Sequence, residues 1–469
     1  MAPISPSYKP DPHYLSLGDG FGDPVAAAGF PKHMLRWRND RAAETVGLHT
    51  LTDREWVEHF GHFAPLPDNM LAPHALRYHG HQFRHYNPDI GDGRGFLYAQ
   101  LRDDKGRLLD LGTKGSGTTP YSRSGDGKLT LKGGVREILA TEMLEALGVS
   151  TSKTFSLIET GEALERGDEP SPTRSAVMVR LSHSHIRIGT FQRLAYFSET
   201  EKIAQLVGYV LETYFDIKPT ADDAENACLM LEQAIKNITT LTADIMAAGF
   251  VHGVLNTDNI NITGENFDYG PWRFLPTLQP DFTAAYFDQT GLYAYGRQPE
   301  AMHWNLYQLG GALVEIAPEA DIRAVLVQWQ THLTTAMRRA YLRRLGITGT
   351  TVAQDDDFLN KILGWMVQSQ IPFHQFFHDW YGGANSIIDH SPVADAYRRD
   401  DFQDIKEGFN HYRPLKHTAR DHAHFQNARA CSLLIEEVED IWTQIDQHDD
   451  WSALMKKIDQ IREMGQALA

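Results

Sequence analysis

Cysteine is nearly missing from this sequence, which holds only Cys228 and Cys431 among its 469 residues. Two widely separated cysteines make neither a disulfide framework nor a CxxC motif of the kind that binds metals or performs redox exchange. We therefore expect a reducing compartment. The sequence leaves open whether the two cysteines pair.

Positive charge is also in short supply. The chain has 44 Lys and Arg against 61 Asp and Glu, so its formal net charge is −17. A protein whose main role is to bind nucleic acid usually presents a basic face, and on this ground we expect no nucleic-acid partner. Local clusters of Arg and Lys can still bind a small anion.

Long apolar runs are absent as well. None reaches the roughly 18 residues of a membrane-spanning helix, so we expect no membrane partner. The first stretch, MAPISPSYKPDPHYLSLGDG, has neither the apolar core of a signal peptide nor the arginines of a transit peptide. The expected location is the cytoplasm, with a mitochondrial location left open.

The pattern of apolar residues changes along the sequence, from strand-like to helical. A helix is predicted over 133–148, with Gly148 as its C-cap, and helical spacing of apolar residues dominates after residue 198. Before that point, short strand-like runs separated by Gly and Asp turns occupy 95–103, 108–115, 128–133, 153–160 and 175–182. We predict an α+β fold of two lobes, strand-rich over 1–195 and helical over 196–469, with a cleft between them.

The segment HGVLNTDN, residues 252–259, begins like the catalytic loop of a phosphotransferase. In protein kinases the base Asp of this loop precedes a metal-binding amide by five positions, and a second metal-binding Asp stands in Asp-Phe-Gly. Here Val254 takes the place of the base, Asn259 stands at the amide position, and Asp268 begins the matching DYG. Asp258, directly before Asn259, is a candidate replacement for the base. Taken alone, NTDN is equally typical of a polar turn.

Cations of the strand-rich half match the needs of a bound nucleotide. Lys114 ends a predicted strand and Glu137 lies in the helix that follows, an arrangement in which a carboxylate steadies a phosphate-binding lysine. Arg180 and Arg187 lie seven residues apart near the end of another strand. For the lysine and glutamate the alternative is an ordinary surface pair, and for the two arginines it is a solvated loop.

The turn GDGRG, residues 91–95, is a weaker signal for the same site. Its backbone amides and Arg94 are suited to hold a phosphate. A plain hairpin turn explains the same glycines, and GDG recurs at 18–20 and 125–127.

Taken in order, these motifs resemble those of the selenoprotein O (SelO/YdiU) family. The matching segments, which run from about residue 70 to 315, are YHGHQF, GDGRG, KGSGTTPYSRSGDGK, REILATEML, SHSHIRIGTF, FVHGVLNTDNINITGENFDYGP and GLYAYGRQPEAMHWNLYQLG. The set is highly specific, although each piece alone is not. One departure is Arg84, at a position where the family commonly has Gly.

The resemblance implies a protein-kinase-like fold, classed as a pseudokinase because the usual base is missing. It also implies transfer of AMP from ATP to Ser, Thr or Tyr hydroxyls of target proteins. ATP would bind turned around, with its γ-phosphate deep and its α-phosphate facing the acceptor. Asp258 would assist the acceptor hydroxyl, while Asn259 and Asp268 would bind Mg²⁺, with Mn²⁺ as an alternative. The residues implied to form the nucleotide site are Gly91, Gly93, Arg94, Lys114, Asp126, Gly127, Glu137 (which would orient Lys114), Arg180, Arg187 and Asp268.

The residues themselves leave rival functions open. One is transfer of another nucleotide such as UMP, or of the γ-phosphate as in a kinase. Another is a pseudokinase scaffold that binds a nucleotide without reaction. The retained set of Asp258, Asn259 and Asp268 argues against the scaffold, which would have no need of metal ligands. Nothing in the sequence separates AMP from UMP.

Overall fold

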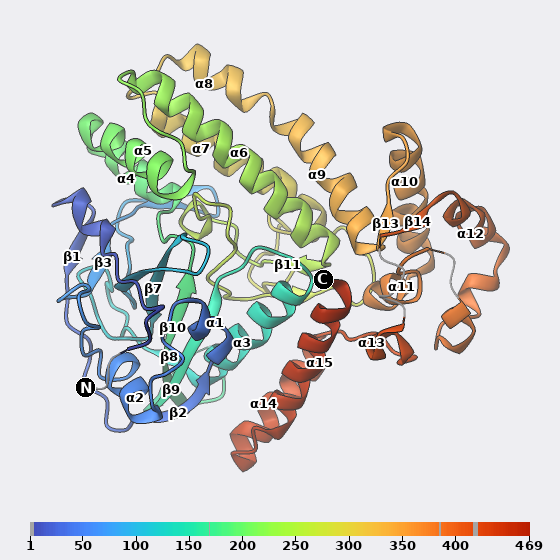
Figure 1. Ribbon diagram of the computed structural model, residues 1–469, viewed down its shortest axis with the longest axis horizontal. Helices are drawn as coiled ribbons and strands as arrows, with labels where there is room; N and C mark the ends of the chain where they lie inside the picture. The colour runs from blue at the N-terminus through green and yellow to red at the C-terminus, as the bar shows by residue number, and fades with distance from the viewer. Residues whose placement is uncertain (1–3, 168, 384–385, 416–420) are drawn as a thin grey trace.

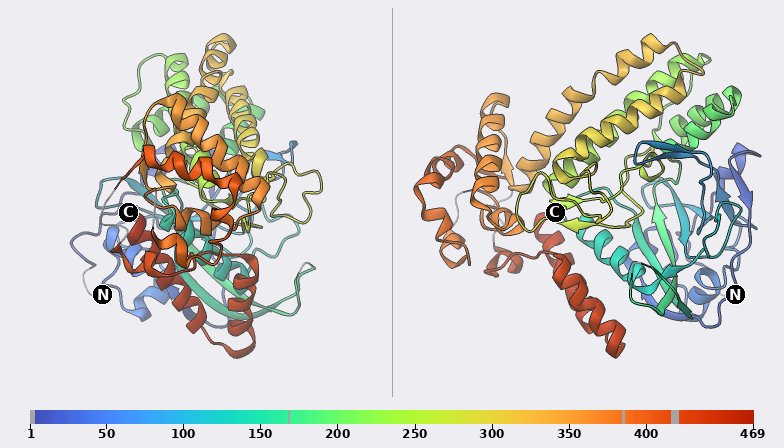
Figure 2. Two further views of the ribbon diagram at one scale, coloured as in Figure 1. Left: turned by 90° about the vertical axis from the view of Figure 1, so that its right-hand side faces the viewer. Right: turned by 180° about the vertical axis from the view of Figure 1, so that it is seen from behind.

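The computed structural model describes residues 4–167, 169–383, 386–415 and 421–469. Figure 1 shows the first part of the chain, in blue to teal, wrapped around a sheet, with long helices in green to orange along its upper side. The view from behind in Figure 2 shows the same division and the last two helices beside the sheet-containing part. The predicted α+β class is confirmed.

The main sheet has eight strands, and neighbouring strands in it pair antiparallel. Its order is β1 (Gly22–Pro24), β3 (His74–Leu76), β6 (Leu97–Arg102), β7 (Leu108–Lys114), β10 (Thr173–Ser182), β9 (Lys153–Leu164) and β2 (Met34–Arg38), with β8 (Leu129–Thr130) paired to β10. All seven residues of β7 are buried, because neighbours flank the strand on both sides and both faces of the sheet are covered.

Alternation along the strands divides their side chains between two hydrophobic cores. On β10, Ala176 and Met178 belong to the core shared with helix α3 (Leu131–Ala146). Val177 and Val179 point the other way, into a core shared with α2 (Asp53–Phe60). This is the period of two expected for a strand with both faces buried. The short helix α1 (Asp40–Thr45) adds to the second core.

Helix α3 starts earlier than the sequence predicted. The expected strand over 128–133 is wrong beyond β8, because the Thr130 hydroxyl accepts a hydrogen bond from the Gly133 backbone N–H at 3.1 Å and caps the helix there. At the other end Gly148 follows the C-cap residue with φ +77°, the left-handed conformation that glycine tolerates. Along its length α3 packs against β9 and β10, which places Glu137 in the interior.

The rest of the chain is mainly helical. Its helices are α4 (Ile188–Tyr196), α5 (Thr200–Tyr214), α6 (Asp223–Ala247), α7 (Gln298–Leu313), α8 (Glu319–Leu326), α9 (Trp329–Arg344), α10 (Val352–Ser369), α11 (Phe373–Asp379), α12 (Gln403–Gly408), α13 (Ala423–Gln426), α14 (Ile435–His448) and α15 (Ser452–Leu468). None of the described helices is both long and apolar enough to cross a membrane.

Short elements connect these larger parts. Three two-stranded pairs are β4 (Gly80–Gln82) with β5 (His85–Asn87), β11 (Phe250–Val251) with β12 (Arg273–Phe274), and β13 (Ile347–Thr348) with β14 (Arg413–Pro414). The 3-10 helices are η1 (His13–Leu17), η2 (Thr257–Asn259), η3 (Tyr295–Arg297), η4 (Ser386–His390), η5 (Ala396–Arg398), η6 (Asp400–Phe402) and η7 (Phe409–His411).

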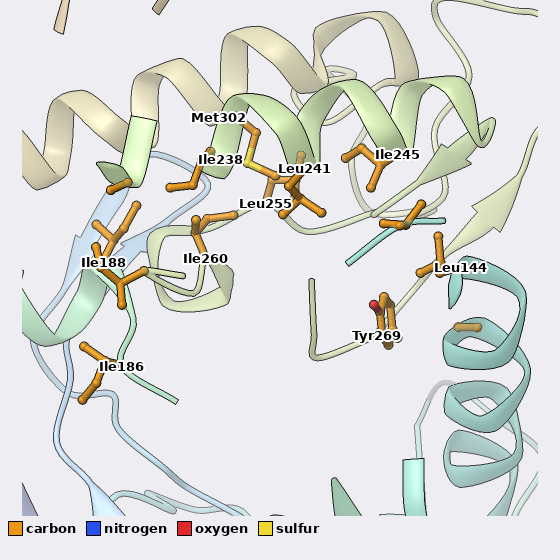
Figure 3. Packing of buried hydrophobic residues seen from close by; sticks show 14 of the residues in the cluster. Leu144, Ile186, Ile188, Ile238, Leu241, Ile245, Leu255, Ile260, Tyr269 and Met302 are labelled. Atoms are coloured by element: carbon orange, nitrogen blue, oxygen red, sulfur yellow. The ribbon is translucent and has the colours of Figure 1, made fainter. Parts of the chain in front are cut away.

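The loop that carries η2 is anchored to the helices by its apolar residues. Figure 3 shows Leu255 and Ile260, which flank the turn, directed toward Ile238 and Leu241 of α6 and toward Met302 of α7. All five side chains are at most 3 % exposed. The polar residues between Leu255 and Ile260 are thereby held on a rigid base.

The C-terminal helices return to the sheet-containing part. Arg462 of α15 donates two hydrogen bonds of 2.8 Å to the carboxylate of Glu142 on α3. Lys132, at the start of α3, donates to Glu439 of α14 at 2.6 Å. These contacts fasten the last two helices to α3, although the boundary between lobes at 195/196 stays a prediction.

Candidate active site

A pocket of about 640 Å³ lies between the main sheet and the loop that carries η2. It is bounded by the ends of β7 and β10, the turn 91–95, the loop 115–128, η2 and the residues that follow Phe267. Of the residues predicted for the site, those in its lining are Gly91, Gly93, Arg94, Lys114, Asp126, Gly127, Arg180, Arg187, Asp258 and Asp268. Glu137 and Asn259 lie outside the lining.

One end of the pocket is a network of buried ions around Asp268. The Lys114 ammonium contacts the carboxylate of Glu137 and donates to Asp268 Oδ1 at 2.7 Å. Arg180 Nη1 donates to the same Asp268 oxygen at 3.3 Å. Lys114, Glu137 and Arg180 are each at most 4 % exposed, so strand β7, strand β10 and helix α3 fix these charges in place.

The charge of Asp268 is strongly stabilised. Burial alone would raise the pKa of this carboxyl, but the attraction of Lys114 and Arg180 outweighs it and holds the pKa well below its ordinary value. The residue has φ +60°, in the left-handed region that non-glycine residues seldom adopt. Asp268 is therefore a permanent anion whose backbone is held in a special conformation facing the pocket.

Arg187 links this end of the pocket to η2. It is the N-cap residue of α4, and its guanidinium donates to the Asp258 carbonyl oxygen and to Asp92 Oδ1, both at 3.0 Å. The guanidinium carbon also lies 4.3 Å from the centre of the Tyr78 ring. With 3 % of its surface exposed, Arg187 is held from several sides before any ligand binds.

Asp258 lies on η2 and also lines the pocket. The hairpin β4–β5 holds this turn: the His81 backbone N–H donates to Thr257 Oγ1 at 2.7 Å, and the Phe83 backbone N–H donates to Asn256 Oδ1 at 3.0 Å. Asp258 Oδ1 is buried and has no hydrogen-bond partner within the described residues. Burial, opposed by the attraction of Arg187, raises the pKa of Asp258 to about 6.

Asn259 is oriented by the residue that replaced the expected base. Its side-chain Nδ2 donates to the Val254 carbonyl at 3.1 Å, and its backbone N–H donates to the Asn256 carbonyl at 2.9 Å. With the amide nitrogen engaged, the side-chain oxygen is left without a hydrogen bond in the described part of the chain. Asn259 and Asp268 thus offer an amide oxygen and a carboxylate oxygen, the hard donors that Mg²⁺ prefers.

The glycines of the opposite wall are required by packing. A Cβ on Gly91 would lie 2.5 Å from the ring of Tyr121, and one on Gly127 would lie 2.2 Å from the backbone of Gly117. Gly127 also has φ +69°. The neighbouring Asp126 accepts from Arg166 at 2.9 Å. Arg94 is exposed at this wall and forms no side-chain hydrogen bond or ion pair with any other described residue.

The sequence-based prediction missed several residues of the pocket. Asp92 lies inside the predicted GDGRG turn, yet its contact with Arg187 depends on residues 95 positions apart that only the fold brings together. Tyr78, Gln82, Tyr121 and Arg123 also line the pocket. Arg123 is exposed and forms no side-chain hydrogen bond or ion pair with another described residue. It lies in the segment KGSGTTPYSRSGDGK, three residues before Asp126, and this position is a sequence signal that could have found it.

Arg84 lies in the turn of the hairpin β4–β5 and ties this hairpin to α7. This residue and Phe83 form the turn with φ +65° and +50°, a conformation in which glycine is the least strained residue. The family's common Gly at this position fits that backbone. In this chain Arg84 donates to Glu300 of α7 at 2.9 Å and lies over the ring of Trp304, so its side chain ties the hairpin to α7.

Comparison with known proteins agrees with this geometry. Residues 6–462 match the model of a family described as protein adenylyltransferase SelO. A protein nucleotidyltransferase YdiU of Trichormus variabilis is 42% identical over 97% of this chain and 96% of its own. A protein of the same description from Synechocystis is 43% identical over 94% of this chain and 95% of its own.

These matches define the chain as an enzyme, a protein nucleotidyltransferase. It belongs to the SelO family of protein adenylyltransferases. Membership in this family implies ATP as the substrate and a protein as the acceptor.

A solved structure from Toxoplasma gondii, ROP2, described as a virulence factor with a protein-kinase fold and no enzymatic activity, is 10% identical and covers 72% of this chain and 81% of its own, with a TM-score of 0.23. The kinase-like character of this chain rests instead on its own elements. A strand lysine is paired with a helix glutamate, and the HG loop and the DYG segment meet them at the junction of the two parts. These elements are the ones that the predicted protein-kinase-like fold requires, and its division into two lobes stays a prediction.

Proposed function

We propose that this enzyme transfers AMP from ATP to Ser, Thr or Tyr hydroxyls of target proteins and releases pyrophosphate. The main support is the separation of charges in the pocket. Lys114 and Arg180 donate to Asp268, while Arg187 donates to the backbone carbonyl of Asp258, whose carboxylate Oδ1 has no hydrogen-bond partner in the described chain. Cations fixed in a buried site suit the phosphates that leave, and a free carboxylate suits the hydroxyl that attacks.

The nucleotide would lie with its terminal phosphates on the cations. Lys114 and Arg180 would hold the β- and γ-phosphates, with Glu137 orienting Lys114 from behind. Gly91, Gly93, Arg94, Asp126 and Gly127 would form the opposite wall. This orientation brings the α-phosphate to the end where Asp258 lies, as expected for a nucleotide that binds turned around.

The chemistry then assigns one task to Asp258. The acceptor hydroxyl oxygen forms a bond to the α-phosphorus, and the bond from that phosphorus to the pyrophosphate oxygen breaks. The hydroxyl proton passes to the carboxylate of Asp258, whose Oδ1 has no competing partner in the described chain. The charge that develops on pyrophosphate is neutralised by Lys114, Arg180 and Arg187.

A divalent metal fits the residues present. The described residues contain no cluster of three or more His, Cys, Asp or Glu side chains that could hold a metal ion. Mg²⁺ commonly uses only one or two protein carboxylates and takes its other ligands from water and phosphates. Asp268 and Asn259 would hold it, and Mn²⁺ accepts the same oxygens. The metal would supply further neutralisation of phosphate charge.

Asp92 would act as a positioning residue for Arg187. Its Oδ1 accepts from Arg187, and its Oδ2 accepts from the Leu76 backbone N–H at 3.2 Å. The backbone carbonyl of Asp92 accepts from the Thr119 hydroxyl at 2.5 Å. One residue thus connects strand β3, the turn 91–95, the loop 115–128 and a phosphate-binding arginine.

The test is label transfer from ATP that carries its label at either the α- or the γ-phosphate. The purified enzyme is incubated with a protein extract, and Asp268→Ala serves as the inactive control. We expect protein to retain the α-label and to lose it in the variant. Retention of the γ-label would make the enzyme a kinase and overturn the proposal. Competition by excess UTP would decide between AMP and UMP as the group transferred.

A further inference from the structure

The lysine of the nucleotide pocket draws its two carboxylate partners from separate segments of the chain. Lys114 contacts Glu137 of helix α3 and Asp268 of the segment that follows Phe267. Both carboxylates meet the lysine only while α3 and this segment keep a fixed position relative to each other. A binding site depends in this way on contacts that support it from outside. A contact that joins the two elements behind the pocket would therefore help to set the geometry inside it.

Arg136 makes such a contact. It directly precedes Glu137, and its Nη2 donates a hydrogen bond of 3.1 Å to the backbone carbonyl of Trp272, four residues after Asp268. Its guanidinium carbon also lies 4.8 Å from the centre of the Trp272 ring. The Trp272 side chain is 1 % exposed, so the residue that Arg136 contacts is itself fixed in the core. The neighbours of the two carboxylates are thus joined to each other.

The segment that carries Trp272 is also tied to the catalytic loop. Strand β12 follows Trp272 directly and pairs with β11, which ends one residue before His252. Nearer to Asp268, the Tyr269 hydroxyl lies within hydrogen-bond distance of the Thr151 hydroxyl, in the loop after α3. A displacement of α3 against this segment would therefore be transmitted to the residues around the pocket.

Glu439 of α14 supplies a counter-charge for Arg136. Its Oε1 lies 3.7 Å from Arg136 Nη1, and its Oε2 accepts from Lys132, one turn earlier on α3, at 2.6 Å. Burial and the neighbouring Arg273 lower the pKa of Arg136 to about 10, against the attraction of Glu439. The side chain therefore stays charged at neutral pH, and a cation in such surroundings needs fixed partners. Figure 1 shows α14 and α15 next to α3, so the last helices of the chain support this contact.

We propose that Arg136 is a positioning residue for nucleotide binding and transfer. By joining α3 to the segment after Asp268, it holds Glu137 and Asp268 at the spacing at which both contact Lys114. Glu439 keeps Arg136 in place, which makes helix α14 part of the support of the site. Arg136 itself lies outside the lining of the pocket, so it acts through the residues it positions. The inference rests on the phosphate-binding role proposed for Lys114.

Arg273 offers a matched control for Arg136. Its Nη1 donates to the same Trp272 carbonyl at 2.9 Å, and Glu439 attracts it as well. Arg273 follows Trp272 in the chain, so this bond stays within one segment and makes no link to α3. Arg136→Gln and Arg273→Gln each remove one cation and one donor from the same oxygen, but only Arg136→Gln breaks the link between the two elements.

The experiment measures the affinity of the full-length chain for ATP with Mg²⁺ by calorimetry, together with α-label transfer and the thermal midpoint of every variant. We expect Arg136→Gln to weaken ATP binding about tenfold, a typical cost of losing one coupling contact, and to lower transfer at low ATP by a similar factor. Arg273→Gln should stay within about twofold of the wild type. Arg136→Lys keeps the charge opposite Glu439 but lacks the planar group over Trp272, so it should lose less than Arg136→Gln.

A double variant separates positioning from general stability. In the Glu137→Gln background Lys114 has already lost its carboxylate partner on α3, so adding Arg136→Gln should cost little further ATP affinity. The decrease in thermal midpoint should still add, because the contact between Arg136 and Trp272 does not pass through Glu137. A merely structural Arg136 would instead weaken ATP binding by the same factor in both backgrounds, and that result would overturn the inference.

The remaining outcomes separate this inference from the proposed function. Wild-type ATP affinity in Arg136→Gln would overturn the positioning role and leave the proposed function standing. Equal losses in Arg136→Gln and Arg273→Gln would also overturn it, because the effect would then belong to the local charge and not to the link with α3. Failure of the wild-type enzyme to transfer α-label would overturn the proposed function, while the ATP affinities of the same variants would still decide on Arg136.

Discussion

Two carboxyl groups of the pocket, Asp268 and Asp258, lie in opposite electrostatic surroundings. Asp268 touches Lys114 and Arg180, and its pKa lies well below the ordinary value. Asp258 is buried with a free Oδ1, and burial raises its pKa to about 6 against the attraction of Arg187. The two carboxyl groups therefore differ in how tightly each holds a proton, and the roles proposed for them rest on this difference.

The difference shows how one pocket separates binding from proton transfer. Environments that push the pKa values of two neighbouring carboxyl groups apart are characteristic of sites in which one group binds a ligand and the other exchanges a proton. Here Lys114 of β7 and Arg180 of β10 donate to the Asp268 carboxylate, while Arg187 donates to Asp258 only at its backbone carbonyl. The proposed base at Asp258 therefore keeps a carboxylate oxygen that no described cation engages.

The largest expected effect comes from removing the fixed anion. Asp268→Ala deletes a proposed metal ligand and leaves Lys114 and Arg180 without their shared partner, so we expect the initial rate of α-label transfer to fall by about a thousandfold or more. Asp440→Ala, at an exposed position of α14, is the control and should keep the wild-type rate. A loss of less than about tenfold would contradict the role given to Asp268.

Removing the proposed base should affect the rate alone. Asp258→Asn keeps the shape of the side chain but cannot accept the proton, and general bases commonly contribute about a hundredfold to ten-thousandfold. We expect kcat to fall by such a factor while the KM for ATP stays near that of the wild type. Steady-state kinetics with varied ATP checks this, and an unchanged kcat would remove Asp258 from the reaction.

A smaller effect should come from the residue that positions Arg187. Asp92→Asn weakens a buried ion pair, and we expect the KM for ATP to rise about tenfold with a smaller change in kcat. The double variant with Arg187→Lys should lose less than the sum of the two single losses, because both changes act on one interaction. Strict additivity in the measured KM values would show that Asp92 acts independently of Arg187.

A third carboxyl, that of Glu265, is buried away from the pocket, and we expect its titration to change the stability of the fold but not the rate of transfer. Burial raises the pKa of Glu265 to about 7, despite the attraction of Lys153 and a hydrogen bond of 2.7 Å from the His183 backbone N–H. Because the folded state holds this proton more tightly than the unfolded state, stability falls as pH rises from about 4.5 to about 7.

Glu265→Gln should remove this pH dependence, since its side-chain oxygen can still accept from His183 but cannot ionise. Relative to the variant, the wild type should lose up to about 3 kcal/mol between about pH 5 and about pH 8. Thermal midpoints of both proteins across this range check the prediction. A constant difference between them would show that Glu265 does not titrate where we place it.

Sequence reasoning succeeded where function depends on spacing along the chain. The order of Lys114, Glu137 and the 252–268 segment follows a known spacing, and the structure brings these residues together. The same holds for the strands β7 and β10, whose apolar runs reflect burial on both faces. Local pattern and tertiary position agree in these segments.

The rest depends on contacts between distant segments. Asp92 meets Arg187, and Glu142 meets Arg462 across 320 positions, pairs that no local pattern indicates. The strand predicted over 128–133 is wrong beyond β8, because the Thr130 hydroxyl caps the helix that starts there.

The most direct test of the division between the two ends is binding without reaction. Calorimetric titration of ATP with Mg²⁺ into Asp258→Asn and Asp268→Asn, side by side with the wild type, separates the roles of the two carboxylates. The account predicts that Asp258→Asn binds within about twofold of the wild type, while Asp268→Asn loses the part of the affinity that requires the metal. Equal loss of binding in both variants would contradict it, because Asp258 would then belong to the binding end of the pocket.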